Sequence, residues 1–247
     1  MRRFYMVPLL RTLTFFVLFW LHQLLILPLL IWRTVQQKRH PGPPTWDETT
    51  KITTFWGKML CFLGGANVTV EDHSGIQSNE TILLVSNHQG DFDIPVLLAY
   101  APNRIGFVAK KELAHIPLVS RWMALMGCIF LDREDRRKQV KQIRQTVDQL
   151  KQGLSMVIFP EGTRSRGGPM KDFAAGSLSI AEKAGVPILP VTLVDTYKLL
   201  PKGAKLFPGA KVKIILHPLI QTTDLSKEEK AELHIRVQNI VQSGLRG

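Results

Sequence analysis

One histidine and one aspartate stand at a spacing that suits an acid–base pair. His88 follows an apolar run at residues 81–86, and Asp93 stands five residues later, at the start of a helical pattern. A turn between them can bring the carboxylate to the imidazole, where it would orient the ring and leave the other ring nitrogen free as a general base. Residues 87–93 hold no serine or cysteine nucleophile, so such a base would activate a hydroxyl group brought by a substrate. The structural alternative makes Asp93 a helix N-cap and His88 a hydrogen-bonded turn residue.

Three further segments place positive charge where predicted strands end. They are residues 159–166, with Glu161-Gly162-Thr163-Arg164 and a second arginine, residues 127–133, which end at Arg133, and the pair Lys110-Lys111. Glycine permits close backbone approach, and guanidinium groups bind phosphate through paired donors. Each cation alone could belong to a solvated basic rim, but together beside His88 they favour a phosphate-binding site.

Alternating strand and helix patterns place these clusters. Strands are predicted at residues 68–70, 81–86, 105–109, 128–131, 155–159, 187–194 and 211–216, and helices at 93–100, 116–126, 135–152, 173–183 and from Ser226 to about 243. Several strands are continuous apolar runs, as expected when both faces are covered. The order predicts an α/β fold with a mainly parallel sheet flanked by helices. In such sheets sites form where strands end and helices begin, which is where the polar clusters fall.

The N-terminal part predicts an attachment to membranes. Residues 13–32 carry no charge, are interrupted by His22, Gln23 and Pro28, and are long enough to span a bilayer. Arginines flank both ends, which gives a weak orientation signal and suits a helical hairpin held in one leaflet. A single transmembrane helix is the alternative. Signal-peptide cleavage is not expected, because Trp32-Arg33 follows the apolar segment in place of small residues.

A second helix is expected after the break at residues 41–44. Thr45 and Glu48 have capping-box spacing, and a stripe of apolar residues that includes Phe55 and Trp56 follows at helical spacing until Gly64-Gly65. This stripe suits an interfacial helix, with a core helix packed on the domain as the alternative. We therefore expect a membrane-anchoring segment at 1–65 and a catalytic domain at 66–247.

Composition narrows the class of partner. The 247 residues are 45% hydrophobic and 21% charged, which excludes a disordered chain and a multi-span membrane protein. A formal charge of +12 points to anionic partners. Nucleic acid is disfavoured, because the cations show no aromatic-interleaved stripe or known module. Cys61 and Cys128 stand in apolar stretches and are expected to be reduced, and the histidines have no metal-ligand spacing.

The chain resembles the glycerolipid acyltransferases in several blocks of its sequence. Four blocks match in order: Asn87-His88 with Asp93, which is the family's His-four-Asp motif, then residues 127–133, 159–165 and 186–191. Residues 110–113 and 173–176 are also similar, and the resemblance covers about 67–217. Gly90 stands where many relatives carry a polar residue, which changes the flexibility of the turn.

The resemblance implies a reaction and assigns roles. His88 would be the general base and Asp93 its orienting partner, while Glu161, Gly162, Thr163 and Arg164 would bind the acceptor's glycerol phosphate, assisted by Lys110 and Arg133. The acyl donor would be acyl-CoA or acyl carrier protein, used as a substrate with no cofactor and no metal. Backbone N–H groups near the helix start would stabilise the oxyanion.

The acceptor implied is lysophosphatidic acid, acylated at its sn-2 hydroxyl to give phosphatidic acid in phospholipid biosynthesis. Glycerol 3-phosphate and other lysophospholipids are alternative acceptors, and the compact chain favours lysophosphatidic acid. A non-catalytic protein that binds anionic membranes is a further alternative, although it would not need a His/Asp pair beside a phosphate clamp. The expected location is the bacterial cytoplasmic membrane, with the catalytic domain on the cytosolic side.

Overall fold

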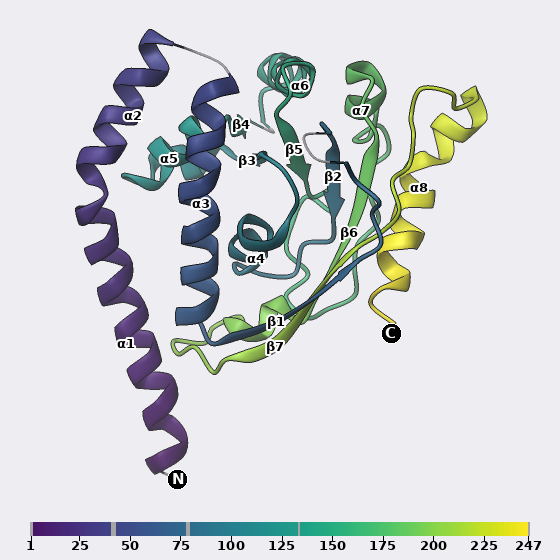
Figure 1. The fold of residues 1–247 in the computed structure, drawn as a ribbon. Helices are drawn as coiled ribbons and strands as arrows, with labels where there is room; N and C mark the ends of the chain where they lie inside the picture. The colour runs from purple at the N-terminus through teal and green to yellow at the C-terminus, as the bar shows by residue number, and fades with distance from the viewer. Residues whose placement is uncertain (1, 41–42, 78–79, 133, 247) are drawn as a thin grey trace.

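A seven-stranded sheet forms the centre of the fold in a computed structural model that describes residues 2–40, 43–77, 80–132 and 134–246 (Figure 1). Its strand order is β1-β7-β6-β2-β5-β3-β4. All pairings between neighbouring strands are parallel except that of β6 with β7. The strands are β1 (Ala66–Asp72), β2 (Leu83–Ser86), β3 (Ile105–Lys110), β4 (Ile129–Leu131), β5 (Ser155–Ile158), β6 (Ile188–Val194) and β7 (Ala210–Leu216). The predicted mainly parallel sheet is confirmed, and each predicted strand ends within two residues of an observed one.

Helices cover both faces of this sheet. The described helices of the α/β part are α4 (Asp93–Tyr100), α5 (Val119–Leu125), α6 (Arg136–Lys151), α7 (Ser179–Ala184) and α8 (Lys227–Ser243), with short 3-10 helices η1 (Lys111–His115) and η2 (Thr196–Leu199). One core packs α4 on the sheet, and the other packs α6, α7 and α8 on the opposite face. The central strands β2 and β5 are buried at every residue, which explains their continuous apolar sequence.

Two predicted helices are shorter than their patterns suggested. The helix predicted at 173–183 begins only at Ser179, because the backbone N–H of Phe173 donates to Oε1 of Gln238 at 2.7 Å and that of Ala174 donates to the Pro160 carbonyl at 3.2 Å. The helix predicted at 116–126 begins at Val119, after Leu118 adopts a φ of +62°. In both places tertiary contacts or an unusual backbone angle override the helical pattern.

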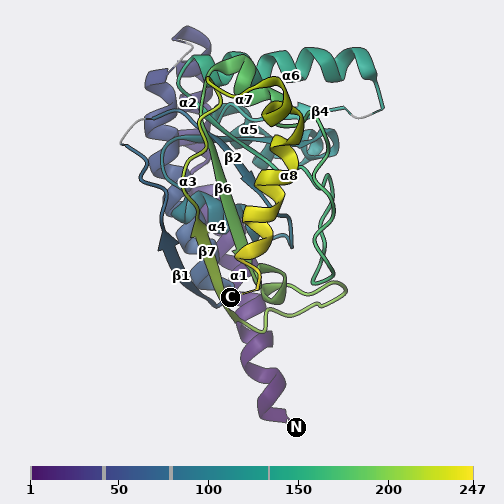
Figure 2. The same ribbon diagram turned by 90° about the vertical axis from the view of Figure 1, so that its right-hand side faces the viewer.

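The N-terminal residues form two antiparallel arms. Helices α1 (Arg2–Leu25) and α2 (Leu27–Arg39) make the first arm, separated by a break at Ile26, and α3 (Pro43–Leu63) runs back beside them (Figure 1). Figure 2 shows the N-terminal end of α1 extending beyond the rest of the fold. In the described part of the chain, one helix segment, Met6–Leu25, is long and apolar enough to cross a membrane by length and composition. How these arms meet a membrane stays a prediction.

The apolar stripe of α3 faces the protein core, so the expectation that it lies on the membrane is wrong for its central residues. Trp56 and Leu60 are buried against α4, while Phe55 is exposed. Gly57 allows this close packing, because a Cβ there would lie 2.7 Å from the backbone nitrogen of Ala99. The helix begins at Pro43, two residues before the predicted start at Thr45.

The proposed division at residue 65 crosses a continuous set of contacts. Besides α3, the first arm binds the loop before β7: Nη1 of Arg11 donates to the carbonyl of Phe207 at 3.1 Å, and Oγ1 of Thr12 accepts its N–H at 2.8 Å. The boundary between the two domains therefore stays a prediction, and the N-terminal segment helps to build the α/β part.

Candidate active site

His88 and Asp93 meet at the end of β2. Nδ1 of His88 lies 2.6 Å from Oδ2 of Asp93, which is the first residue of α4 and fully buried. The same oxygen accepts the backbone N–H groups of Gln89 at 2.7 Å and Gly90 at 2.9 Å, so the loop wraps around the carboxylate. The other oxygen, Oδ1, accepts a hydrogen bond from the hydroxyl of Thr196 in η2. The five-residue spacing thus produced the contact that it predicted, and Asp93 is not an N-cap.

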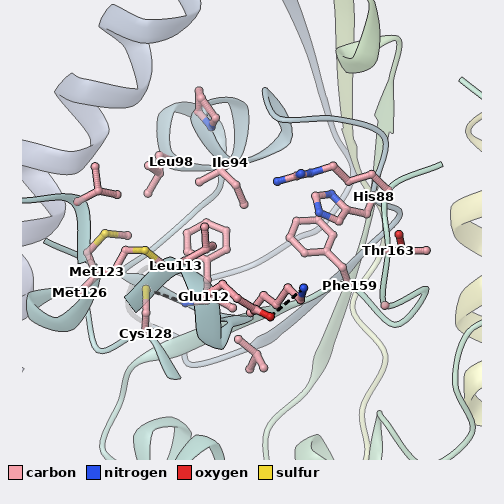
Figure 3. A pocket seen from close by; sticks show the side chains of 18 of the residues that line it. His88, Ile94, Leu98, Glu112, Leu113, Met123, Met126, Cys128, Phe159 and Thr163 are labelled. Carbon is pink, nitrogen blue, oxygen red and sulfur yellow. Dashed lines mark hydrogen bonds and ion pairs between the residues drawn. The ribbon is translucent and has the colours of Figure 1, made fainter. Parts of the chain in front are cut away.

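Phe159 covers one face of the His88 imidazole. The two rings stack with centroids 4.1 Å apart and planes at 18°, and the histidine side chain is 14% exposed. Because Nδ1 is engaged with Asp93, Nε2 is the ring nitrogen that can exchange a proton with a bound molecule. Figure 3 shows His88 at the edge of the cavity beside Phe159 and Thr163.

Glu161 connects residues 159–166 to the loop that carries His88. Its Oε1 accepts the backbone N–H of His88 at 2.6 Å and its Oε2 accepts that of Lys171 at 2.9 Å. Burial raises the pKa of Glu161, an effect that these two N–H donors oppose. Among the described residues that line the cavity are Gly162, Thr163 and Arg164, but not Glu161. The carboxylate therefore positions the loop that carries His88, and its implied contact with the acceptor stays a prediction.

Two arginines of residues 159–166 line the same cavity as His88. Arg164 and Arg166 both line it, and both pair with Asp91, at 3.0 and 3.7 Å. The backbone N–H of Ser165 donates to the His88 carbonyl at 2.8 Å, and that of Arg166 donates to the Gln89 carbonyl at 3.0 Å. These bonds hold the arginine-bearing segment beside the loop that carries His88. The sequence placed Arg166 in the predicted basic cluster, but the family resemblance assigned it no contact with the acceptor.

The other predicted cations divide between the cavity and the surface. Lys110 lines the cavity, with its Nζ 3.0 Å from Oε1 of the exposed Glu112. Lys111 does not line it, because its ammonium group is bound by Asp132 at 3.0 Å and by Glu134. Arg133, which was expected to assist in phosphate binding, lies outside the described residues.

The cavity has a volume of about 540 Å³ and joins a charged end to an apolar one. His88, Arg164 and Arg166 line the charged end, next to Gly162 and Thr163. The apolar walls come from α3, α4, β3, η1, α5 and the segment that follows α5, and they include Trp56, Leu60, Ile94, Leu98, Phe107, Leu113, Met123, Met126 and Cys128. Figure 3 shows Met123, Met126 and Cys128 grouped away from His88. Such a space can hold a molecule with an anionic head and a hydrocarbon chain.

The two cysteines are buried and free, as predicted, and burial raises the pKa of each thiol to about 12. Neither therefore has the thiolate character of a nucleophile. In the part of the chain that the structure describes, no group of three or more His, Cys, Asp or Glu side chains could hold a metal ion.

Comparisons with known proteins identify the family of this chain. A sequence model of the family described as Acyltransferase matches residues 67–194. The chain is 33% identical to a 1-acyl-sn-glycerol-3-phosphate acyltransferase of Borreliella burgdorferi over 176 residues, which cover 71% of this chain and 70% of that protein. It is 35% identical to a chloroplast 1-acyl-sn-glycerol-3-phosphate acyltransferase of Arabidopsis thaliana, over 61% of this chain and 42% of the relative. The chain thus spans less than half the length of that chloroplast relative.

A solved structure matches almost the whole fold. The crystal structure of the 1-acyl-sn-glycerophosphate (LPA) acyltransferase PlsC from Thermotoga maritima superposes with a TM-score of 0.82 at 30% sequence identity. The match covers 98% of this chain and 95% of that one, including the N-terminal helices. The family model also spans every one of the four motif blocks from residue 87 to residue 191. The chain belongs to the Acyltransferase family.

Proposed function

We propose that this protein transfers a fatty acyl group from a thioester to the sn-2 hydroxyl of 1-acylglycerol 3-phosphate and so makes phosphatidic acid. One observation carries the proposal: the His88–Asp93 pair opens into a cavity with guanidinium groups at one end and apolar walls at the other. The names of the relatives, which describe enzymes acting on 1-acyl-sn-glycerol 3-phosphate, support this choice of acceptor.

The His88–Asp93 geometry supports general-base catalysis. Nε2 of His88 takes the proton from the acceptor hydroxyl while the hydroxyl oxygen attacks the thioester carbonyl carbon. The tetrahedral intermediate collapses, the carbon–sulfur bond breaks, and the sulfur leaves as a thiol with the proton returned by His88. Asp93 keeps Nδ1 protonated and stabilises the positive charge that the ring carries between the two steps.

The charged end of the cavity suits a phosphate group. Arg164 and Arg166 present two guanidinium groups within one turn of chain, and Lys110 adds an ammonium group at the rim. The N–H groups of His88, Gln89 and Gly90 already donate to carboxylates, so these three are not free to bind an oxyanion. We therefore assign stabilisation of the oxyanion to a guanidinium group rather than to these three backbone N–H groups.

The apolar part of the cavity suits a hydrocarbon chain of the lipid substrates. Acyl-CoA and acyl carrier protein present the same thioester and are both proposed as donors, with no metal or cofactor in the reaction. Exposed apolar side chains along α1 support a position at a membrane surface, where lipid substrates reside. We propose the cytosolic face of a bacterial cytoplasmic membrane and a one-leaflet arrangement of the N-terminal arms.

Thiol release by the purified full chain in detergent tests the function. Acyl-CoA and acyl carrier protein are each supplied with lysophosphatidic acid, glycerol 3-phosphate or a lysophospholipid with a larger headgroup, and the lipid product is identified by mass spectrometry. Phosphatidic acid formed fastest with lysophosphatidic acid is the expected result. Faster transfer to glycerol 3-phosphate would replace the acceptor, and binding to anionic vesicles without any transfer would leave only a membrane-binding role.

A further inference from the structure

The hydroxyl of Thr196 completes the environment of the Asp93 carboxylate. Thr196 opens η2, after the end of β6, and is fully buried. Its hydroxyl donates to Oδ1 of Asp93, 103 residues earlier in the sequence. We propose that Thr196 is a positioning residue that fixes the Asp93 carboxylate in the orientation that His88 requires. The inference rests on the proposed acyl transfer, which turnover by the wild-type protein tests separately.

The distribution of donors on Asp93 explains why one hydroxyl matters. Oδ2 accepts three bonds, from Nδ1 of His88 and from the N–H groups of Gln89 and Gly90. Among donors in the described residues, Thr196 alone reaches Oδ1. Without it, one oxygen of a fully buried carboxylate would have no partner, which is costly. The carboxyl plane would also lose one of the contacts that limit its rotation about the Cβ–Cγ bond.

Thr196 is itself held by the residues on either side of His88. Asn87 bonds the backbone of Leu193 in β6 in both directions, at 2.9 Å from Nδ2 to the carbonyl and 2.8 Å from the N–H to Oδ1. Gln89 accepts the backbone N–H of Thr196 on Oε1 at 3.2 Å. The end of β6 is therefore fastened to the catalytic loop before and after His88, so the hydroxyl has a fixed place relative to the imidazole.

The charged side chains near His88 and Asp93 bind other groups than the Asp93 carboxylate. Glu161 holds the backbone of His88 from the segment after β5, and Arg164 and Arg166 pair with Asp91 on the cavity side. In the described part of the chain none of these side chains donates to an oxygen of Asp93. Thr196 does not line the cavity, so its hydroxyl acts on the reaction through Asp93.

Substitutions at position 196 separate the hydroxyl from the shape of the side chain. Thr196→Val keeps the shape and removes the donor, so kcat should fall by about 10- to 100-fold, as expected for a lost bond to a charged group. The KM values for lysophosphatidic acid and for the thioester should stay unchanged. Thr196→Ser keeps the hydroxyl and should retain most of the wild-type kcat.

Thr192→Val provides a matched control. Thr192 is a fully buried threonine of β6 whose hydroxyl donates to the Val241 carbonyl at 2.8 Å and lies 2.8 Å from Nε2 of His217. Its loss should lower Tm by an amount similar to that of Thr196→Val and leave kcat unchanged. If Thr196→Val fails to fold, Thr196→Cys, a weaker donor, takes its place and should lie below Thr196→Ser in kcat.

A double-mutant cycle with Asp93→Asn decides whether Thr196 acts through Asp93. In that background Thr196→Val should reduce the residual kcat by less than about twofold, because the carboxylate that it positions is gone. The proposal would be overturned if the kcat losses of Asp93→Asn and Thr196→Val multiplied fully in the double variant. It would also be overturned if Thr192→Val lowered kcat as much as Thr196→Val does, or if Thr196→Ser were as slow as Thr196→Val. All of these comparisons assume an active wild-type protein, so a failure of the proposed function would be seen first.

Discussion

Nη2 of Arg164 lies 3.0 Å from Oδ1 of Asp91, so an arginine of the segment after β5 is paired with a carboxylate of the loop after β2. Nη1 of Arg166 lies 3.7 Å from Oδ2 of the same carboxylate, which therefore bridges both guanidinium groups. All three side chains are about one third exposed. Partly exposed ion pairs contribute little to stability, so an incoming phosphate can replace Asp91 at small cost.

Arg164→Ala should weaken the use of the acceptor and leave the donor almost unaffected. Loss of a charged hydrogen-bond partner costs about 1.5–3 kcal/mol, which corresponds to a rise of about 10- to 100-fold in the KM for lysophosphatidic acid. The KM values for both substrates should be measured side by side. Arg144→Ala on the exposed surface of α6 controls for the loss of one positive charge. A change confined to the thioester would show that the arginine binds the donor.

His88→Ala should abolish acyl transfer while the protein still folds and binds membranes. Removal of a general base costs about 10²- to 10⁴-fold in rate, and Asp93→Asn should also be severe because Nδ1 loses its carboxylate partner. Steady-state turnover is compared with Tm and with vesicle binding for each variant. His234→Ala on α8 serves as a control histidine substitution. Near wild-type turnover of His88→Ala would exclude the mechanism.

Met123→Trp should shift the preference of the enzyme towards shorter acyl chains. Met123 lines the apolar part of the cavity, and an indole there would fill space that a hydrocarbon chain needs. Each methylene that is no longer buried loses about 0.8 kcal/mol, so kcat/KM should fall progressively with chain length. A series of acyl-CoA donors measures this, with Met123→Leu as the volume-matched control. An equal loss at every chain length would place the acyl chain elsewhere.

Glu161 should make stability depend on pH with a defined sign. Burial raises the pKa of this carboxyl above its value in the unfolded chain, so the folded state binds the proton more tightly. The contribution of Glu161 to stability is therefore fully present below the ordinary carboxyl pKa and is lost as pH rises through the raised value. Tm measured from about pH 4 to pH 7 for wild type and Glu161→Gln isolates this effect. The Tm of the variant relative to wild type should increase as pH rises, and a decrease would contradict the assignment.

The N-terminal arms should lie in one leaflet without crossing the bilayer. Positive residues at both ends of the apolar segment suit two ends held at the same anionic surface, and α3 returns beside α1 and α2. Arg2→Cys and His40→Cys, treated with an impermeant thiol reagent on sealed vesicles, should both label from the side that holds the catalytic part. Cys61 and Cys128 are buried, so the variant without an added cysteine gives the background. Labelling of position 2 only from the opposite side would establish a transmembrane helix.

The sequence by itself determined the elements of this fold and the chemistry of its central pair. Apolar runs and helical periodicity are local properties, so they located the strands, the start of α4 at Asp93 and the start of the last helix at Ser226. The five-residue spacing of His88 and Asp93 is also local, and a single turn closes it. Local patterns failed where tertiary contacts took over the backbone, as at Phe173, or where the stripe of α3 packed on α4.

Only the tertiary structure decided which distant residues support that pair. Strand order places β5 and β6 on either side of β2, and no local spacing encodes that order. It brings Glu161, 73 residues away, to the backbone of His88, and Thr196, 103 residues away, to the carboxylate of Asp93. It also pairs Arg164 with Asp91 across the same boundary between strands. Burial of the sheet fixes these contacts, because the strands cannot change neighbours without exposing the apolar side chains that are packed on its two faces.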